Sequence, residues 1–378
     1  MKVYFDNAAT TKVRDEAIEL MVRVMSEDYG NPSSTHSMGR KAATLRENAR
    51  KEVATALGTN PENIYFTSGG TEADNWAVLG LAELTHRKGK HIITSATEHS
   101  AVLEPIKKLE SLGWQVTYLS PGKDGCIAAK DFACALQTDT AFASIMLINN
   151  ETGSLNPINE FAAEIKSRRL STYLHTDAVA AFCKVPVSVK NLAADLITVS
   201  AHKIHGPKGI GALYIKNGLN LHPAQLGGSQ EHGKRPGTEA LPAAVGFGEA
   251  ARLGFIEFNE TSAKVQELRD YTVAQLQKQL PEAVIISQGG SPFILSLSLP
   301  GHKSEVLMSY LEAEGICVSR SSACKKGTRS RVLEAMKLPN GVIDGALRVS
   351  FSRYSTTEEA DYFIKTLKQA SDRLFKAL

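Results

Sequence analysis

Polar and ionisable side chains follow five of the β-rich runs of the chain, at the point where each run ends. Gly70 and Thr71 open a helical stretch after the first run, and His99 follows the second. The fourth, fifth and sixth runs are followed by Asn149 and Asn150, by Asp177, and by Ser200, His202 and Lys203. Because ligands of an open parallel sheet bind beyond the carboxyl ends of its strands, we expect these groups to meet at one edge.

Each group has an ordinary structural interpretation when it stands alone. A Gly-Gly-Thr turn before a helix is usually only a turn with a cap, His99 could simply begin a helix, and Asp177 could end a strand. Lys203, which stands among histidines, would by default be a solvated loop lysine. The segments at 69–72 and 206–211 match neither a Walker loop nor a dinucleotide fingerprint. The set as a whole is therefore more informative than any single member.

Taken together, these residues suit pyridoxal phosphate. A lysine with a lowered pKa can form a Schiff base with this cofactor, and burial beside other cationic groups would lower the pKa of Lys203. A carboxylate such as Asp177 can pair with the protonated pyridine nitrogen, so that the ring accepts electrons from the substrate. The imidazole of His99 can stack on the ring and move protons. The helix start at Gly70 suits a phosphate dianion.

The elements that would position these residues alternate between strands and helices from about residue 15 to residue 250. The predicted strands are 64–67, 91–95, 115–119, 142–149, 172–176, 195–199 and 212–215, and helical stretches at 72–87, 102–112 and 161–169 separate some of them. Several of the strands are nearly continuously apolar, which is typical of strands buried on both faces. The pattern predicts an α/β fold with a mostly parallel sheet sandwiched by helices.

The character of the sequence changes in the last third of the chain. The predicted elements there are a long helical stretch, a strand at 293–299, a helix near 305–314, a Ser/Lys/Gly-rich loop at about 319–330 and a strand at 347–351. The pattern Ser355-Thr-Thr-Glu358 indicates a capping box before a final helix. We therefore expect a large α/β domain over 15–255, and a smaller α+β domain formed by 1–14 and 256–378.

Length and composition exclude several classes of protein. A chain of 378 residues suggests two domains, and 43% hydrophobic with 22% charged residues excludes disorder. No apolar run approaches the ~18 residues of a membrane span, and the N-terminus reaches an acidic residue too early for a secretory signal. A net charge of +3 argues against binding nucleic acid. Five scattered cysteines without a Cys-x-x-Cys pair predict neither disulfides nor a metal site, so we expect a soluble cytoplasmic protein.

A set of short motifs runs along the whole chain in a characteristic order. The motifs are YFDNAATT at 4–11, GNPSS at 30–34, FTSGGTE at 66–72, TEH at 97–99, NNETG at 149–153, HTDA at 175–178, SAHKIHGPKG at 200–209, RPGTE at 235–239, SAC at 322–324 and LRVS at 347–350. In these motifs the chain resembles the cysteine desulfurases of the class V aminotransferase group, of the iron–sulfur-cluster and nitrogen-fixation type. The resemblance covers essentially the whole chain.

The resemblance implies a fold-type I pyridoxal-phosphate enzyme that converts L-cysteine to L-alanine through an aldimine, leaving a persulfide on Cys324. Lys203 would carry the cofactor, Asp177 would contact the pyridine nitrogen, and His99 would stack on the ring and transfer protons. The phosphate would be held by Gly70, Thr71, Ser200 and His202 and, across a subunit interface, by Thr238. Asn150 would contact the ring oxygen and the substrate, and Arg348 would bind the substrate carboxylate. An arginine suits a carboxylate because its fork forms two hydrogen bonds.

Cys324 would be the catalytic thiol. Its polar surroundings suggest an exposed, mobile loop, and Lys325 and Lys326 favour the nucleophilic thiolate. The other four cysteines are expected to be small buried hydrophobes. The persulfide would pass to a sulfur-acceptor protein for iron–sulfur cluster assembly or tRNA thiolation, and Cys324 would be the only candidate for a transient iron–sulfur ligand. The resemblance also implies a homodimer, with no membrane and no direct nucleic-acid partner.

Two positions depart from the family pattern. Ala180 stands where the family usually has a glutamine that donates to the ring oxygen, so we expect an altered cofactor pKa or another donor. Arg320-Ser321 replaces the common Ser-Gly before the cysteine motif. Two alternatives share fold and cofactor: a selenocysteine lyase, which the sequence hardly separates, and a class V aminotransferase, which Cys324 disfavours. The intact site residues disfavour a regulator without enzymatic activity.

Overall fold

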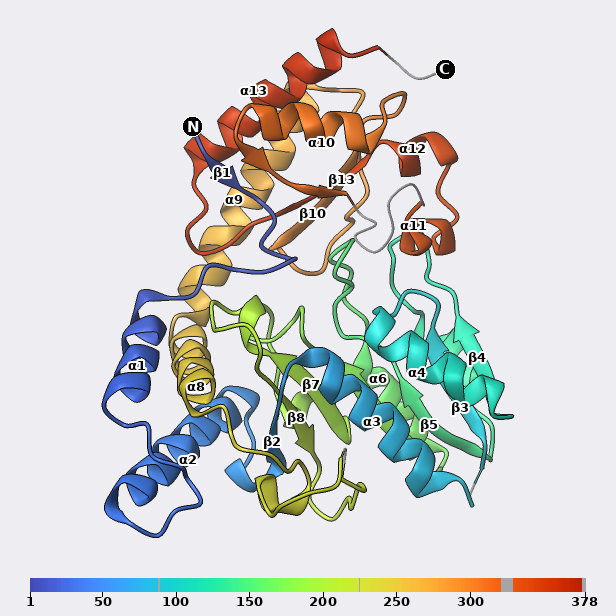
Figure 1. Cartoon of the computed structure of the whole chain (residues 1–378). Helices are drawn as coiled ribbons and strands as arrows, with labels where there is room; N and C mark the ends of the chain where they lie inside the picture. Colours follow the sequence, from blue (N-terminus) through green and yellow to red (C-terminus); the bar gives the residue numbers. More distant parts are fainter. Residues whose placement is uncertain (88, 224, 321–328, 376–378) are drawn as a thin grey trace.

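The computed structural model describes residues 1–378 except 88, 224, 321–328 and 376–378. Its larger sheet has seven strands in the order β2-β8-β7-β6-β5-β3-β4 (Figure 1). The strands are β2 (Ile64–Thr67), β3 (His91–Ser95), β4 (Gln115–Leu119), β5 (Thr140–Ser144), β6 (Tyr173–Asp177), β7 (Leu196–Ser200) and β8 (Gly211–Ile215). Neighbouring strands are parallel, except that β8 is antiparallel to both β2 and β7. The predicted α/β fold with a mostly parallel sheet is confirmed.

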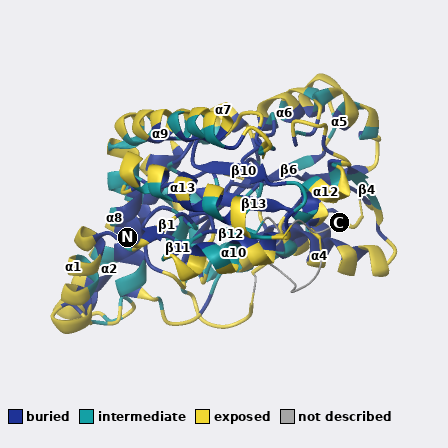
Figure 2. Ribbon diagram, turned by 90° about the horizontal axis from the view of Figure 1, so that it is seen from above, coloured by how far each residue is buried: buried dark blue, intermediate teal, exposed yellow. Residues whose placement is uncertain are grey.

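Helices cover both faces of this sheet, because successive strand residues point to opposite sides and both sides are apolar. The helices are α1 (Asp15–Ser26), α2 (Ser37–Leu57), α3 (Gly70–Thr85), α4 (Ser100–Ser111), α5 (Ala129–Ala135), α6 (Ile158–Ser167), α7 (Val189–Leu192) and α8 (Leu241–Ile256). Ile92 and Leu196 pack in the apolar cluster of α3 and α4, whereas their neighbours Ile93 and Ile197 pack in the cluster of α2, α6 and α8. Figure 2 shows the buried strands inside the exposed outer faces of the helices.

The predicted strand at 142–149 is wrong beyond Ser144, where β5 ends. The N–H groups of Ile145 and Leu147 still donate to carbonyls of β6, at 3.1 and 2.9 Å. The N–H of Met146 donates instead to the carboxyl group of Glu98, at 2.9 and 3.0 Å to its two oxygens. On one side of residues 145–147, the buried side chain of Glu98 therefore takes the place of a neighbouring strand as hydrogen-bond acceptor. An apolar sequence pattern cannot predict this exchange of partners.

A second, four-stranded sheet has the order β12-β13-β10-β9 and is antiparallel. The elements of this part of the chain are α9 (Phe258–Gln279), β9 (Val284–Ile285), β10 (Ile294–Ser298), α10 (Ser304–Ala313), β11 (Ile316–Cys317), β12 (Ser319–Arg320), α11 (Arg331–Ala335), α12 (Asn340–Asp344), β13 (Ala346–Ser350) and α13 (Thr357–Arg373). The first strand, β1 (Val3–Tyr4), pairs with β11, and Phe5 packs edge-on against Phe351 and Phe363. We propose that the boundary between two domains lies where α8 meets α9.

The capping box of the last helix lies one residue later than the sequence pattern indicated. The hydroxyl of Thr356, not of Ser355, accepts from the backbone N–H of Glu359, and the Glu359 carboxylate accepts from the Thr356 N–H at 3.0 Å. Ser355 is occupied elsewhere, since its hydroxyl accepts from the N–H of Ser352 at 3.0 Å. The sequence contains two overlapping capping patterns, one beginning at Ser355 and one at Thr356. The hydrogen bond from Ser352 to Ser355 leaves Thr356 as the cap.

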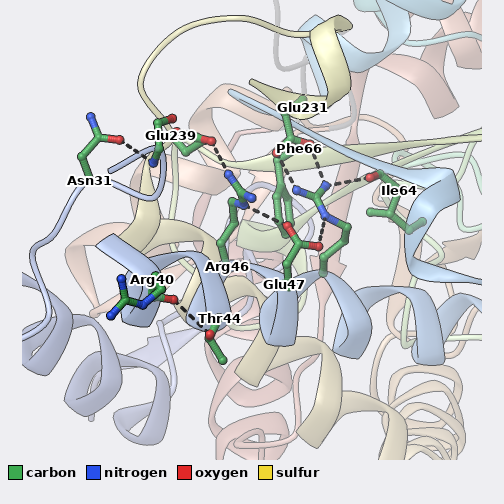
Figure 3. A network of polar contacts seen from close by, with 11 residues as sticks. Asn31, Arg40, Thr44, Arg46, Glu47, Ile64, Phe66, Glu231 and Glu239 are labelled. Atoms are coloured by element: carbon green, nitrogen blue, oxygen red, sulfur yellow. Dashed lines mark hydrogen bonds and ion pairs between the residues drawn. The ribbon is translucent and has the colours of Figure 1, made fainter. Parts of the chain in front are cut away.

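A buried ion pair fixes the segment that follows β8 (Figure 3). Arg50 of α2 is 1% exposed and donates to both carboxylate oxygens of Glu231, at 2.6 and 2.7 Å. Glu231 also accepts from the N–H of Phe66, at 2.8 Å. Arg46, on the same helix, pairs with Glu239, the residue after Thr238. The α2 helix therefore holds the segment that carries Thr238 against β2.

Removing one member of the buried pair is expected to destabilise the protein. Glu231→Gln leaves the Arg50 charge buried without a full counter-charge, and we expect a loss of about 3–5 kcal/mol in the free energy of unfolding. Urea unfolding followed by circular dichroism measures this value. Glu104→Gln is the matched control, because its pair with Lys107 is solvent-exposed and its loss should change stability by less than about 1 kcal/mol. Equal effects of both variants would contradict the expectation.

Candidate active site

A cavity of about 340 Å³ lies where the central strands of the larger sheet end. Such a volume is in the range of small-molecule sites, roughly 300–1,000 Å³. Seven of the residues singled out in the sequence line it: Gly70, Thr71, His99, Asn150, Asp177, His202 and Lys203. Ala180, the departure from the family pattern, also lines this cavity and has no side-chain donor to offer.

Lys203 ends a single 3-10 turn after β7 and points its amine at the N-terminal segment. Its Nζ donates to the backbone carbonyls of Ala8 and Ala9, at 2.5 and 2.8 Å. Burial, together with the nearby charge of Arg348, lowers the pKa of Lys203 to about 8, although Asp177 acts in the opposite direction. A substantial fraction of the amine is therefore neutral at mildly alkaline pH, which is the form that attacks a carbonyl.

Two buried carboxylates line the same cavity. Burial raises the pKa of Asp177, while the Val179 N–H, which donates to Oδ1 at 2.8 Å, and the charges of His99 and Lys203 lower it. Burial and the charge of Asp177 raise the pKa of Asp74 well above its usual range. Since the cationic groups favour the ionised form of Asp177 alone, the shared proton belongs on Asp74.

Behind Asp74 lies a neutral histidine. Nε2 of His175 is 3.6 Å from Asp74, but burial lowers the pKa of His175 to about 3, so the contact is not an ion pair. The ring instead contacts the hydroxyls of Thr198 and Ser144, at 3.1 and 2.8 Å. His175 therefore gives Asp177 no positive charge from the interior, and among the described residues the cations that favour its ionised form are His99 and Lys203, which line the cavity.

His99 both begins a helix and lines the cavity, so it combines the two interpretations that the sequence left open. Its Nδ1 accepts from the N–H of Ala101 at 3.1 Å and so caps α4, while the ring lines the cavity. Because Nδ1 accepts, the neutral ring carries its proton on Nε2. The cap fixes the ring and leaves Nε2 for proton transfer.

The first turn of α3 has the features of a phosphate site. No side chain caps this helix, which begins at Gly70 beside the cavity. A Cβ at Gly70 would lie 2.9 Å from the side chain of Val179 and 3.9 Å from that of Ser200, so only glycine leaves this space open. Ser200 is buried at the end of β7. The uncapped N–H groups and the dipole of a 16-residue helix suit an anion.

Arg348 is buried on β13 and is held by two segments of the cavity rim. Its Nη1 donates to the Asn150 carbonyl and its Nη2 to Asp6, both at 3.0 Å. Asp6 also accepts from Ser319, at 2.7 Å, beside the start of the undescribed segment. The buried Nε of Arg348 has no hydrogen-bond partner in the part of the chain that the structure describes. An unpaired guanidinium N–H is suited to a ligand carboxylate.

Three other expected features do not belong to the described lining of the cavity, or lie outside the described residues. Thr238 is exposed and does not line it. Cys324 and Ser321 fall outside the described residues, whereas Arg320 pairs with Glu305 of α10 at 2.7 Å.

The other four cysteines are free thiols, and the expectation that they are buried is wrong for Cys134, which is exposed on the short helix α5, and holds only in part for the half-buried Cys126, Cys183 and Cys317. The described residues contain no cluster of His, Cys, Asp or Glu able to hold a metal ion.

Two acids next to residues that line the cavity, the buried Glu98 and the half-buried Glu151, were not expected from the sequence to matter for the site. Glu98 accepts from Ser95 at 2.6 Å, and burial raises its pKa to about 8. Burial likewise raises the pKa of Glu151 to about 7, and this residue accepts from Ser330 at 2.5 Å. Both acids occur inside motifs named above: Glu98 directly precedes His99, and Glu151 directly follows Asn150. Their place beside a candidate site residue is the sequence signal that could have pointed to them.

The fold and the cavity define a pyridoxal-phosphate enzyme of fold type I. A lysine with a lowered pKa, a buried carboxyl group whose ionised form is favoured by nearby cationic groups, and an uncapped helix start all line one cavity, which fits this cofactor. When bound there, the cofactor supplies an electron sink for the substrate carbon.

Comparison with known proteins supports the assignment to this class of enzyme. The "Aminotransferase class-V" family model matches residues 3–363. The chain is 40% identical to "Cysteine desulfurase IscS" of Dictyoglomus turgidum over 377 residues, which cover 99% of this chain and 95% of the relative. It is also 40% identical to "Cysteine desulfurase IscS" of Methanosarcina thermophila, covering 98% and 92%.

A solved structure named "NIFS-LIKE PROTEIN" superimposes with a TM-score of 0.94 at 37% identity, covering 99% of this chain and 100% of the other. "SspA in complex with cysteine" does so with a TM-score of 0.81 at 31% identity, covering 94% and 100%. The chain belongs to the cysteine desulfurases of the class V aminotransferase family.

The lowered pKa of Lys203 is open to direct titration. In cofactor-free protein, we expect the rate of Lys203 acylation to rise with a midpoint near pH 8, rather than near the ~10.4 of an ordinary lysine, because burial disfavours the ammonium form. Peptide mass spectrometry after short pulses of reagent measures the rate. Asp177→Asn should move the midpoint further down and Arg348→Met should move it up. A midpoint near pH 10 would contradict the assignment.

Proposed function

We propose that the chain is a pyridoxal-phosphate-dependent cysteine desulfurase that converts L-cysteine to L-alanine and leaves the sulfur on Cys324 as a persulfide. The observation that carries the proposal is the placement of Lys203 and Asp177 in one cavity with perturbed pKa values. The relatives at 40% identity and the neighbour solved with cysteine support the substrate.

The roles of the residues follow from their positions. Lys203 would hold the cofactor covalently, Asp177 would face its pyridine nitrogen, and His99 would stack on its ring. Gly70 and Thr71, with Ser200 and His202, would hold the phosphate, and Asn150 would face the ring oxygen and substrate.

Arg348 would bind the substrate carboxylate, since its buried Nε lacks a partner among the described residues. His99 Nε2 would exchange the proton that leaves or returns to the substrate.

The sulfur step uses only protein and substrate atoms. The thiolate of Cys324 attacks the substrate sulfur, so that a sulfur–sulfur bond forms while the bond from that sulfur to the substrate β-carbon breaks. The electron pair of the broken bond stays with carbon, which is protonated to give the methyl group of alanine. The enzyme gains one sulfur atom, and no external oxidant is needed.

The segment that follows the undescribed residues is anchored to the rim of the cavity. Ser330 donates to Glu151 at 2.5 Å, and its hydroxyl accepts from Leu333 N–H at 3.1 Å, capping α11. Arg331 donates to the backbone carbonyl of Glu98 at 2.5 Å. These contacts lie beside His99 and Asn150. We propose that Glu151 positions the segment that carries Cys324, six residues before Ser330.

The proposed function predicts one added sulfur on a single peptide. After incubation with L-cysteine, mass spectrometry should find this sulfur on the Cys324 peptide, and Cys324→Ser should lose both the sulfur and alanine formation. Cys134→Ser is the matched control, because it removes an exposed thiol away from the cavity and should leave both intact. Sulfur found elsewhere, or alanine formation without Cys324, would refute the role of Cys324.

The anchoring role of Glu151 predicts a difference between two variants. Glu151→Ala loses the acceptor for Ser330, and we expect persulfide formation to slow by about tenfold, because small displacements of a reacting group reduce rates strongly. Glu151→Gln keeps an acceptor oxygen and should retain most of the rate. The cofactor absorbance and the apparent affinity for L-cysteine serve as readouts that should not change. Glu160→Ala, an exposed residue of α6, controls for general effects.

We also propose a homodimer in which Thr238 contacts the phosphate bound to the partner. Thr238 is exposed in the single chain, and nearby Leu226 is 93% exposed. On α1, Ile18, Val22 and Met25 are exposed on one helical face, which is unusual for a free surface. Sedimentation analysis should find a dimer, and a fully active monomer would exclude this arrangement.

The sulfur acceptor is proposed to be a protein of iron–sulfur cluster assembly or tRNA thiolation. The proposed location is the cytoplasm, because the described cysteines are free thiols, as is usual in reducing compartments. No helix among the described residues is long and apolar enough to cross a membrane.

A further inference from the structure

A second, smaller cavity lies on the other side of the turn that carries Lys203. Its volume is about 30 Å³, and its lining includes Arg14, Lys184, His205, Thr261 and Arg353. It shares no lining residue with the cofactor cavity. A volume of this size exceeds the ~10–15 Å³ that one water molecule needs, so the cavity can hold a water-sized or slightly larger occupant.

The cavity is lined by more positive than negative charge. Arg14 is 3% exposed and Lys184 is 6% exposed, so both cations are withdrawn from bulk water. Glu257 pairs with Arg14 at 2.8 Å and also with Arg353, so one carboxylate serves two guanidinium groups. Lys184 has no carboxylate partner among the described residues, and the ring of Phe293 lies with its centroid 5.7 Å from Nζ.

The lining also offers donors without matching acceptors. Nε of Arg14 is buried and lacks a hydrogen-bond partner in the part of the chain that the structure describes. His205 is uncharged, since burial lowers its pKa to about 4, and burial raises the pKa of the Cys183 thiol to about 12. Burial and the charges of Lys203 and Arg348 lower the pKa of Lys184 to about 7. Among the described residues that line the cavity, none carries a negative charge to balance a protonated Lys184, and an unpaired buried charge is expensive.

We propose that this cavity binds a small monovalent inorganic anion of about the size of chloride, held by Arg14, Lys184 and Arg353. The anion supplies the missing negative charge and an acceptor for the Arg14 Nε–H and the Lys184 ammonium.

The position of the cavity gives the anion a structural role. Arg14, Lys184 and His205 precede the junction of α8 and α9, whereas Thr261, Phe293 and Arg353 follow it. Arg353 lies five residues after Arg348, just beyond β13. The bound anion therefore ties the segment after β13 to the part of the chain that carries Lys203.

Anion-specific thermal stabilisation of the pyridoxal-phosphate-loaded protein tests the proposal. At constant ionic strength, replacing sodium gluconate by sodium chloride should raise the unfolding midpoint by about 2–5 °C, because an anion that binds only the folded state stabilises it. Lys184→Met should abolish the difference. Lys190→Met, an exposed lysine six residues away, should retain it. Equal midpoints of the unchanged protein in the two salts would overturn the proposal.

Diffraction with bromide in place of chloride tests the site directly and does not depend on a variant that folds. An anomalous peak between Arg14, Lys184 and Arg353 is the expected result. Density for water alone in this cavity, without anomalous signal, would mean that Lys184 is neutral and would overturn the proposal.

Discussion

Burial of ionisable groups at the carboxyl edge of the larger sheet is the constraint on which the site depends. Withdrawal from water disfavours every charge, so Lys203 becomes partly neutral and Asp74 protonated. Burial raises the pKa of Asp177 as well, but the charges of His99 and Lys203 on its cavity side act against this rise. The same burial thus prepares a nucleophilic amine, while the neighbouring cationic groups favour the carboxylate form of Asp177 on the side of the cavity.

The second sheet contributes to the same edge through hydrogen bonds that cross between distant segments. Arg348 reaches Asn150 and Asp6, and Ser330 reaches Glu151. These contacts join residues 150–151 to strands and helices nearly 200 positions later in the chain. Arg348 and the start of α11 are therefore linked to the residues around the cavity by partly buried polar contacts and not by apolar packing alone.

Much of this architecture was accessible from the sequence, because local patterns determine it. Apolar runs located all seven strands of the larger sheet, and the polar residues after them line one cavity, as the parallel topology requires. The incorrect predictions, the end of one strand and the first residue of the capping box, arose where two nearby groups compete for one hydrogen bond. Met146 leaves the ladder because Glu98 accepts its N–H, and Ser355 loses the capping position because Ser352 engages its hydroxyl. Glu151 and Asp74 gain importance only through residues remote in sequence.

The acceptors of the Lys203 amine are main-chain oxygens of Ala8 and Ala9, not side chains. Alanine scanning of this stretch would therefore register nothing, since the residues are already alanine and any replacement keeps the peptide carbonyls. Only a shift of the chain trace itself, such as an inserted residue or an amide-to-ester exchange, can perturb these contacts. The contacts that hold the Lys203 amine are thus invisible to the truncation of side chains.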